Sequence, residues 1–494
     1  MPSDLRFSAS PSDAVRGRSH VVLMGPRGIL RKRQPWKHLF KGRWTSALEE
    51  MAAGTEPAPL GRLVTTWPST ERVPARVSLG ILPDTVSRHL SPSRAHAVQE
   101  CCSKAELSRG GATAVVLVLD DERHLLPAAV AVGRALPTFD LKTGKRRATQ
   151  VTVAAMLADG TPIAPPQSVV RTVAAARWAA GMVDRPTADL DTAMFVEQAL
   201  AFLDGVGGVD TQVIVGDDLL GRSLGAIHAV GRAATVPPRL LVLAHGPESS
   251  RRTVALVGKG VVFDSGGLAL KPREGMLGMK GDMGGGAAAV GAFRTLVAEG
   301  FPGRLLCVVP LAENAVGPMS YRQDEVLRMH SGKTVEINNT DAEGRLLLAD
   351  AASFAVRELG AGVVVEAATL TGAQPVSTGK RHAAVISNLE GLERLGIEAG
   401  LRSGDLCRPL PFAPELYQRE FKSEIADMKN SVRDRANAQS SCAAQFVWSH
   451  IAETGVPWLH LDIAGPAHHA EKGTGFGVAL MAEIVRSLGE EHLR

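Results

Sequence analysis

Short apolar runs alternate with helix-compatible stretches along the chain, and this alternation predicts an α/β protein. In the first third, ATAVVLVLDD (residues 112–121) is followed by the helix-compatible LLPAAVAVGRAL. Further strand-like runs occur later in the chain, at TQVIVG, RLLVLAH, TVALVGKG, RLLCVVPL and GVVVEAATL. Because these runs are largely apolar rather than alternating, they are typical of strands in a sheet that is covered on both faces.

Two neighbouring segments indicate how the chain divides. Residues 159–168, DGTPIAPPQS, are rich in proline and turn formers and predict a linker. The next residues, VVRTVAAARWAAGMVDRP, have helical spacing that stops at Pro186. A chain of 494 residues also exceeds what one hydrophobic core usually serves. We therefore expect one α/β domain over residues 1–165 and a second over residues 166–494.

The composition is that of a globular protein, with 45% hydrophobic and 21% charged residues. No apolar stretch reaches about 18 residues, so a membrane span is not predicted. The N-terminal segment lacks a continuous apolar run of about 7 to 15 residues, so a secretory signal peptide is not predicted, and Asp4 and Asp13 count against a transit peptide. The five cysteines lack CxxC spacing and predict neither a zinc knuckle nor a disulfide framework. We expect a reducing, cytoplasmic location.

The formal charge of +4 is too small for a chain of this size to predict a nucleic-acid partner by itself. One segment is denser in cations: residues 27–44, RGILRKRQPWKHLFKGRW, hold seven of them with aromatic residues between. Such a run could follow a phosphate backbone, but it is more often a solvated face or an interdomain surface. We expect the solvated face, and neither nucleic acid nor a membrane as a partner.

Charged residues gather in three loops near the ends of predicted strands. They are Lys259 and Asp264 in VALVGKGVVFDSGGLALKP, Lys271 at its end, Asp282 in GMKGDMGGGAAAVGAF, and Asp341 and Glu343 in NNTDAEGRLLLADA. Open α/β sheets bind their ligands at such strand ends. Charges in a strand environment are costly unless they are paired or bound to a metal ion.

Four carboxylates in one cleft would repel one another, and divalent cations are the simplest way to neutralise them. The pattern therefore predicts an oxygen-rich site with room for two metal ions. A lysine can join the ligands only as the neutral amine, which burial and adjacent cations both favour. For any single loop, a turn with solvent-facing charges explains the residues equally well. For all three loops together that explanation is weak.

Arg345 comes two residues after Glu343, at the start of a predicted helix. A guanidinium beside a helix N-terminus makes a good anion site, because its donors and the backbone N–H groups converge there. Alternatively, Arg345 pairs with Asp341 or Glu343. The sequence leaves both interpretations open.

Several other chemistries are not supported. The segment GGGAAA (284–289) satisfies G-x-G-x-x-A, yet it does not follow a strand, and SGKT (331–334) lacks the glycine that a P-loop needs at Leu327. No G-x-S-x-G and no H-E-x-x-H occur. His468 and His469 are adjacent, without the spacing of metal ligands.

Five blocks together resemble one known family: VGKGVVFDSGGLALKP, GMKGDMGGGAAAVGAF, NNTDAEGRLLLADA, ATLTGA and WLHLDIAGPA. They are similar to the leucyl, or cytosol, aminopeptidase family (M17), whose signature is NTDAEGRL. The resemblance covers about residues 170–494. VEINNTDAEGRL and ADMKNSVRDRANAQSSCA look most similar to its "probable aminopeptidase-like" branch. The resemblance implies a catalytic domain with a central mixed sheet flanked by helices, and by analogy a macro-like N-terminal α/β domain.

The resemblance also implies a set of site residues. One metal ion, zinc or manganese, would be held by Asp264, Asp341 and Glu343, and a second by Lys259, Asp264, Asp282 and Glu343. Lys271 would polarise the scissile carbonyl, and Arg345 would hold a bicarbonate ion that relays protons. Met279, Thr369 and Gly372 would line the pocket for the first side chain of the substrate, and Leu370 would offer its backbone carbonyl. Gly281 departs from the family, which usually has a larger residue there, and this puts the rigidity of the pocket in doubt.

The implied function is that of a metal-dependent aminopeptidase acting on small peptides through a water activated by two metal ions, in a homohexamer. The alternative is a degenerate hexameric scaffold or peptide-binding protein, with nucleic-acid binding through residues 27–44 as a further option. The spacing of Asp341 and Glu343 suits the leading interpretation, since residues two apart in an extended segment point to the same face.

Overall fold

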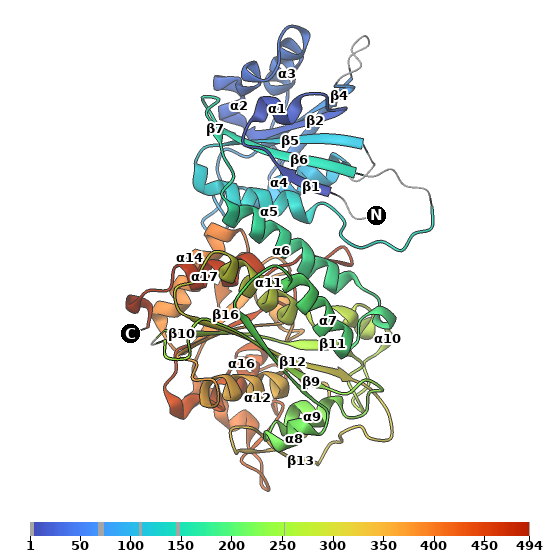
Figure 1. Ribbon diagram of the computed structural model, residues 1–494, viewed down its shortest axis with the longest axis vertical. Helices are drawn as coiled ribbons and strands as arrows, with labels where there is room; N and C mark the ends of the chain where they lie inside the picture. Colours follow the sequence, from blue (N-terminus) through green and yellow to red (C-terminus); the bar gives the residue numbers. More distant parts are fainter. Residues whose placement is uncertain (1–3, 68–73, 108–110, 145–148, 251, 494) are drawn as a thin grey trace. The chain divides into compact units, whose positions relative to one another are not determined.

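The computed structural model describes residues 4–67, 74–107, 111–144, 149–250 and 252–493 (Figure 1). The chain forms two compact units: unit 1 is Met1–Arg177 with Gly400–Leu406, and unit 2 is Trp178–Ala399 with Cys407–Arg494. Each unit has its own sheet with helices packed on it, which confirms the predicted α/β class. Within the described ranges, no helix combines the length and the apolar character needed to cross a membrane.

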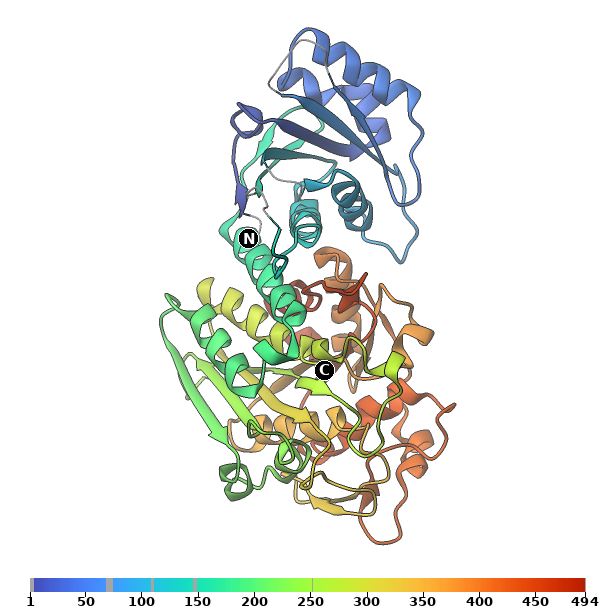
Figure 2. The same cartoon turned by 90° about the vertical axis from the view of Figure 1, so that its right-hand side faces the viewer.

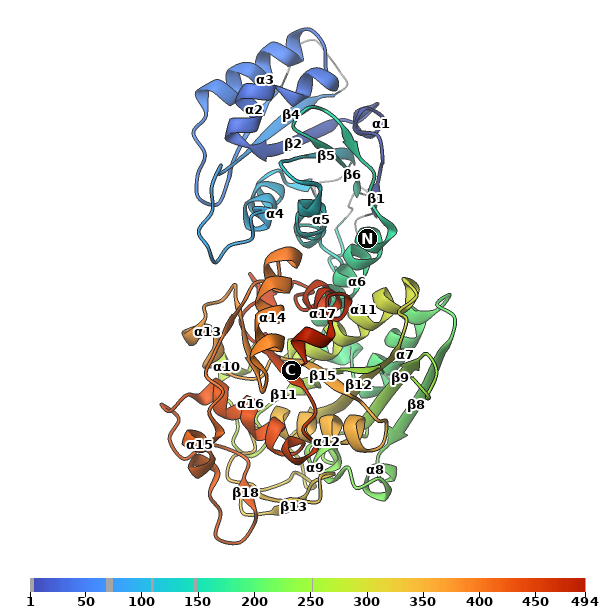
Figure 3. The ribbon, with the colours of Figure 1, turned by 90° about the vertical axis from the view of Figure 1, so that its left-hand side faces the viewer.

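Unit 1 is built on a mixed sheet with the strand order β1-β6-β5-β2-β4-β3, and β7 pairs with β6. The central pairs are parallel, and β3 and β7 are antiparallel to their neighbours. The strands are β1 (Asp4–Phe7), β2 (His20–Pro26), β3 (Arg62–Thr66), β4 (Arg76–Leu82), β5 (Gly111–Leu119), β6 (Thr149–Leu157) and β7 (Pro162–Ile163). The helices are α1 (Pro11–Val15), α2 (Arg27–Arg33), α3 (Arg43–Gly54), α4 (Ala95–Lys104) and α5 (Leu125–Arg134). Helices α2 and α3 cover one face of the sheet, and α4 and α5 cover the other (Figures 1 and 3).

The basic segment 27–44 forms α2, a 3-10 turn and the start of α3. Its aromatic residues face inward: Trp36 is 0% exposed, Phe40 9% and Trp44 6%, and all three pack in the core of unit 1. Burying each ring contributes on the order of 2–3 kcal/mol. The exposed side chains of the segment are His38 and six of the seven cations, and none of its tryptophan or phenylalanine rings is exposed for stacking bases. This arrangement fits the solvated helical face.

The predicted linker is only partly irregular. Two of its residues, Pro162 and Ile163, form β7 and pair with β6, because the turn at Gly160 brings the chain back along that strand. Helix α6 (Gln167–Asp184) begins within the predicted segment and ends just before Pro186, as its spacing indicates.

Unit 2 contains a mixed sheet with the strand order β17-β16-β19-β15-β10-β12-β9-β8, and β11 extends the pairing along β12. The five strand-like runs of the sequence become β8, β9, β10, β12 and β15. The strands are β8 (Val209–Val215), β9 (Arg239–His245), β10 (Thr253–Gly258), β11 (Gly260–Asp264), β12 (Arg304–Asn314), β15 (Val363–Ala368), β16 (Ala383–Ser387), β17 (Cys407–Pro409) and β19 (Trp458–Asp462). Smaller sheets join β13 (Val326–Arg328), β14 (Thr334–Glu336) and β18 (Met428–Lys429), and pair β20 (His468–His469) with β21 (Lys472–Gly473).

Helices cover both faces of the unit 2 sheet, with α11 and α17 on one side and α12 and α16 on the other (Figure 1). The same layering is visible from two further directions in Figures 2 and 3. The helices of unit 2 beyond α6 are α7 (Thr192–Leu203), α8 (Asp218–Gly221), α9 (Gly225–Gly231), α10 (Arg273–Met276), α11 (Gly284–Ala298), α12 (Gly344–Arg357), α13 (Gln374–Ser377), α14 (Glu390–Ser403), α15 (Pro414–Tyr417), α16 (Gln439–Ser449) and α17 (Val478–Arg486). Burial on both faces explains why the central strands are apolar throughout.

Four neighbouring strands of this sheet, β12, β10, β15 and β19, run parallel to one another. Their carboxyl ends therefore meet at one edge, where open α/β sheets bind ligands. Polar residues lie at this edge: Lys259 follows β10, Asn314 ends β12, Thr369 follows β15 and Asp462 ends β19.

We predict that one buried histidine makes unit 1 sensitive to acid. His20 on β2 is 3% exposed, and its Nε2 lies 2.9 Å from Ser78 Oγ. Burial lowers the pKa of His20 from 6.5 to about 3, and the charge of Arg76 adds to this. Between these pH values His20 binds a proton in the unfolded chain but not in the folded chain. The free energy of unfolding should therefore fall as the pH drops below 6.5 toward 3. We expect a slope of about 1.4 kcal/mol per pH unit from this residue.

Urea unfolding followed by circular dichroism between about pH 7 and pH 4 measures this slope. In the His20→Asn variant the slope should be smaller by this amount. The variant His38→Asn, which changes an exposed histidine of the same unit, should keep the wild-type slope. Equal slopes for the wild type and His20→Asn would contradict the prediction.

Candidate metal centre

The polar residues predicted to form the site lie at the ends of several helices, strands and turns, and their side chains converge on one cluster. Lys259 directly follows β10, Asp264 is the last residue of β11, and Asp282 follows the short 3-10 turn η5 (Met279–Gly281). Glu343 is the N-cap of α12. These residues are distant in sequence, and strand ends, a 3-10 turn and a helix start together bring them to one place.

Lys259 lies at the centre of the cluster and is 2% exposed. Its Nζ is 2.7 Å from Asp282 Oδ2 and 2.9 Å from Glu343 Oε1, and it donates a hydrogen bond to the Thr369 carbonyl at 3.1 Å. Residue 344 must be glycine for this arrangement, since a Cβ there would lie 2.5 Å from Lys259 Cε. A glycine at the start of α12 thus leaves the space that the lysine occupies.

Lys271 occupies the opposite side of the carboxylates. Its Nζ lies 2.8 Å from Asp264 Oδ2 and also contacts Asp341 Oδ1. Its side chain is 16% exposed, so unlike Lys259 it remains accessible from the cavity. Each lysine therefore joins two carboxylates that come from different loops.

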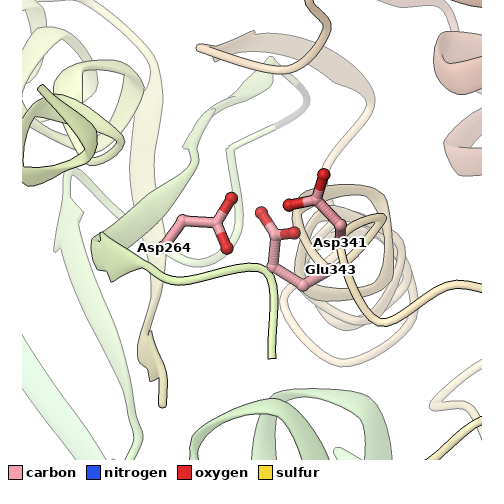
Figure 4. Close-up of side chains that lie close together, drawn as sticks. All are labelled: Asp264, Asp341 and Glu343. Carbon is pink, nitrogen blue, oxygen red and sulfur yellow. The ribbon is translucent and has the colours of Figure 1, made fainter. Parts of the chain in front are cut away.

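Asp264, Asp341 and Glu343 point their carboxylates toward one another (Figure 4). One oxygen from each lies within 4.8 Å of the others. Glu343 Oε2 is buried and accepts no hydrogen bond from the described residues. The expected extended conformation of this segment is wrong: residues 339–342 form a turn, with Ala342 N–H donating to the Asn339 carbonyl at 3.2 Å, and Glu343 is already helical. The turn, rather than a strand, places Asp341 and Glu343 on the same side.

The electrostatics reflect this crowding. Burial raises the pKa values of Asp264 and Asp282 above the ordinary aspartate value, and the charge of Glu343 adds to both. For Lys259, burial alone would lower the pKa, but the charges of Asp282 and Glu343 outweigh it and raise the pKa. Without another cation the lysine is therefore the charged ammonium, not the neutral amine that a metal ligand requires.

The donor set fits divalent cations. It offers several carboxylate oxygens within a ligand's reach of a common centre, and one of them has no hydrogen-bond partner among the described residues. Hard oxygen ligands suit manganese, and carboxylates also bind zinc. Binding of cations would relieve the repulsion among the carboxylates and lower the pKa of Lys259, because both effects follow from added positive charge.

Among the described residues, Arg345 forms no ion pair with Asp341 or Glu343. It is 4% exposed, and its Nη1 donates to the Asn430 carbonyl at 3.1 Å. Its Nε is buried and has no partner among the described residues. Burial lowers the pKa of Arg345 to about 10. A buried guanidinium with unused donors beside a helix N-terminus is suited to an anion.

One cavity of about 770 Å³ brings all the predicted site residues together. Its wall includes Lys259, Asp264, Lys271, Met279, Asp282, Asp341, Glu343, Arg345, Thr369, Leu370 and Gly372. This volume is typical of a small-molecule or peptide site. A cavity of similar volume elsewhere in unit 2, around Tyr417 and Trp448, contains none of these residues.

Two residues that shape the site, Asn314 and Asp462, were missed by the motif reasoning, and Thr369, which was expected only on the pocket wall, also bonds to the acidic cluster. The Asn314 amide donates to Asp264 Oδ1 at 2.9 Å, and Thr369 Oγ1 donates to Asp282 Oδ1 at 2.8 Å. Asp462, which is 0% exposed, accepts bonds from Leu370 N–H and Thr371 Oγ1 and so holds the loop that follows β15. Asp462 belongs to WLHLDIAGPA, and a polar residue ending an apolar strand was the available signal.

Comparisons with known proteins agree with this geometry. Residues 177–482 match the model of the cytosol aminopeptidase family, catalytic domain, and residues 19–145 match that of the M17 aminopeptidase N-terminal domain 2. The mouse protein named "Probable aminopeptidase NPEPL1" is 41% identical, and the match covers 99% of this chain and 94% of the mouse protein. The similarity thus extends into unit 1, further than the sequence blocks indicated.

Two solved structures are also similar to this chain. One is the leucyl aminopeptidase from Trypanosoma brucei in complex with bestatin, with a TM-score of 0.89, 35% identity, and coverage of 99% of this chain and 96% of that chain. The other is the bottromycin maturation enzyme BotP in complex with Mn, with a TM-score of 0.77, 29% identity, and coverage of 95% and 99%. On the evidence of both family models and these full-length similarities, the chain belongs to the cytosol aminopeptidase family, M17.

Proposed function

We propose that this protein is a metal-dependent aminopeptidase that removes the first residue of small peptides by hydrolysis. The observation that carries the proposal is the convergence of four carboxylates, two lysines and one arginine on a single cavity of about 770 Å³. Membership of the aminopeptidase family and the similarity to a leucyl aminopeptidase that binds bestatin support it.

We propose that two divalent cations, zinc or manganese, are held by the acidic cluster. Asp264 and Glu343 would contact both cations. Asp341 would complete one ligand set, and Lys259 and Asp282 the other. Bound divalent cations supply Lewis acidity, which lowers the pKa of water and stabilises negative charge on oxygen. The similar enzyme BotP was solved with Mn, which supports manganese as one occupant.

The cavity has features that suit the start of a peptide. Its carboxylate-rich end favours a free amino group, and only the first residue of a peptide offers one. Met279, Thr369 and Gly372 would surround the first side chain. The loop after β15 would present the Leu370 carbonyl to the substrate backbone, and Asp462 fixes that loop through Leu370 N–H.

Two positively charged side chains of the cavity, Lys271 and Arg345, are assigned to the reacting bond. Lys271 Nζ, partly accessible beside Asp264, would stabilise negative charge that develops on the scissile carbonyl oxygen. Arg345, with its buried and unpartnered Nε, is the residue we assign to a bicarbonate ion, the proton relay that the family resemblance implies. The overall reaction adds water across the amide, so that the new carboxyl group and the released amine carry its atoms.

The competing proposal is a scaffold or peptide-binding protein with the same fold but no activity. The presence of every expected ligand type argues against it. By resemblance we also expect a homohexamer and a cytoplasmic location. The five cysteines are free thiols, all buried, which suits a reducing compartment.

We predict that activity depends on the bound metal. After dialysis against a chelator the full chain should hydrolyse leucine p-nitroanilide at less than about 1% of its loaded rate, and added Mn²⁺ or Zn²⁺ should restore activity. Metal analysis of the reconstituted protein should give about two ions per chain. In Asp341→Asn the metal affinity should fall by at least about tenfold, since one charged ligand is lost.

The variant Asp210→Asn, which changes an exposed carboxylate on β8, serves as the control and should bind metal as the wild type does. Fewer than one ion per chain after reconstitution would favour the inactive scaffold. Full activity of the chelator-treated protein would also reject the proposed chemistry.

We predict a separate effect for Lys271. Replacing Lys271→Ala should lower kcat by about 100- to 1,000-fold, the loss typical when one group that stabilises an oxyanion is removed. Arg273→Ala removes an exposed cation two residues away and should leave kcat unchanged. Steady-state rates at equal metal loading make the comparison. A Lys271→Ala variant as active as the wild type would rule out this role for Lys271.

A further inference from the structure

A histidine ring occupies the space that a side chain at position 281 would need. An ideal Cβ on Gly281 would lie 1.9 Å from His468 Nε2 and 2.6 Å from His468 Cε1. A side chain at 281 and the present position of the imidazole therefore exclude each other. Gly281 lies between Met279, on the cavity wall, and Asp282, in the acidic cluster.

The ring is presented by a strained hairpin. β20 and β21 pair His468 with Gly473, and the two residues of the connecting turn are Ala470 and Glu471. Both have left-handed backbone conformations, with φ of +48° and +62°. Glycine and asparagine favour such positions, whereas alanine and glutamate adopt them reluctantly. A strained turn persists only where its surroundings hold it, and it is often found at functional sites.

The end of α6 holds the hairpin in place. Gly473 N–H donates to Asp184 Oδ1 at 2.7 Å, and a Cβ at position 473 would lie only 2.6 Å from the Ala180 carbonyl oxygen. The same helix end holds the turn that contains Gly281, because Lys280 Nζ donates to the Asp184 carbonyl at 2.6 Å. Asp184 thus holds both the hairpin that carries His468 and the turn that carries Gly281.

His468 lines the same cavity as Met279, Thr369 and Gly372. Its Nε2 is buried, and its ring makes no hydrogen bond with any residue that the structure describes. Nε2 faces position 281, whereas Nδ1 is not among the buried ring atoms. The adjacent His469 is exposed, as expected for the opposite face of a strand.

We propose that His468 is a specificity-determining residue, which gives the pocket for the first side chain a polar end and favours N-terminal glutamine or asparagine. A side-chain amide has both a donor and an acceptor, so it can pair with Nδ1, the ring nitrogen that is not enclosed against position 281, in either tautomer. Gly281 is the condition for this role, because a larger residue would displace the ring. The proposal rests on the aminopeptidase function proposed above.

The test compares two substrates on the manganese-loaded full chain. The quantity measured is the ratio of kcat/KM for glutamine 7-amido-4-methylcoumarin to kcat/KM for the leucine compound. In His468→Phe, which keeps a ring against Gly281, the ratio should fall by about three- to tenfold, the effect of losing one neutral hydrogen bond. In His469→Phe, the matched control, it should stay within about twofold of the wild type. A purely structural defect would lower both rates and leave the ratio unchanged.

The outcomes separate this inference from the proposed function. If the wild type cleaves the leucine compound but His468→Phe keeps the wild-type ratio, the role of His468 is wrong and the aminopeptidase stands. If the loaded wild type cleaves neither compound, both proposals fail together.

A second measurement, independent of activity, tests the contact itself. Gly281→Ala forces the ring out of its place, so Tm should drop by about 2–4 °C, the shift that ordinary overpacking strain produces in a unit of this size. Adding His468→Ala to Gly281→Ala removes the clash and should recover most of that loss. A Gly281→Ala variant that melts like the wild type would show that the ring does not lie there and would overturn the proposal.

Discussion

The mutual repulsion of four carboxylates in one largely buried space constrains the rest of unit 2. Asp264, Asp282 and Glu343 are 3%, 5% and 2% exposed. Like charges so enclosed are tolerated only where cations lie among them and hydrogen bonds satisfy the remaining oxygens. The two lysines meet this condition in the structure by each joining carboxylates from different loops. Divalent ions would meet it more fully, because each carries twice the charge.

This constraint explains the hydrogen bonds immediately around the cluster. Asn314 donates both to Asp264 and to the Thr340 carbonyl, and the buried Tyr321 hydroxyl donates to the same carbonyl. Asn430 plays the equivalent part for the turn before Glu343, since its amide donates to the Asn339 carbonyl and accepts from two backbone N–H groups. Neutral amides can bond to carboxylates and backbone without adding charge. They therefore fix the carboxylates in place and leave the charge of the cluster available to cations.

The sequence predicted the participants better than their local geometry. Apolar strands ending in charged residues were sufficient to place Lys259 and Asp264 near one another, because parallel strands deliver their carboxyl ends to the same edge. A spacing of two residues, by contrast, is compatible with a strand or with a turn that enters a helix, so the conformation of residues 339–342 was assigned wrongly. The partner of Arg345 could not be foreseen, since Asn430 lies 85 residues further along the chain. Similarly, aromatic residues between cations suit a stacking surface or a core, and only packing places Trp36 in the core.

A sequence motif can identify the charged groups of a site, but it cannot identify the residues that only pack against them. A ligand set must contain particular chemical groups, so its members are recognisable as residue types in sequence. The wall of a pocket needs only to be filled, and any element that reaches it can do so. A glycine at 281 therefore leaves open what occupies the space beside it, and the answer comes from a hairpin that begins at His468, far along the chain and held by Asp184. For the same reason, the residues of the acidic cluster can be recognised from the sequence separately from those that shape the cavity beside it.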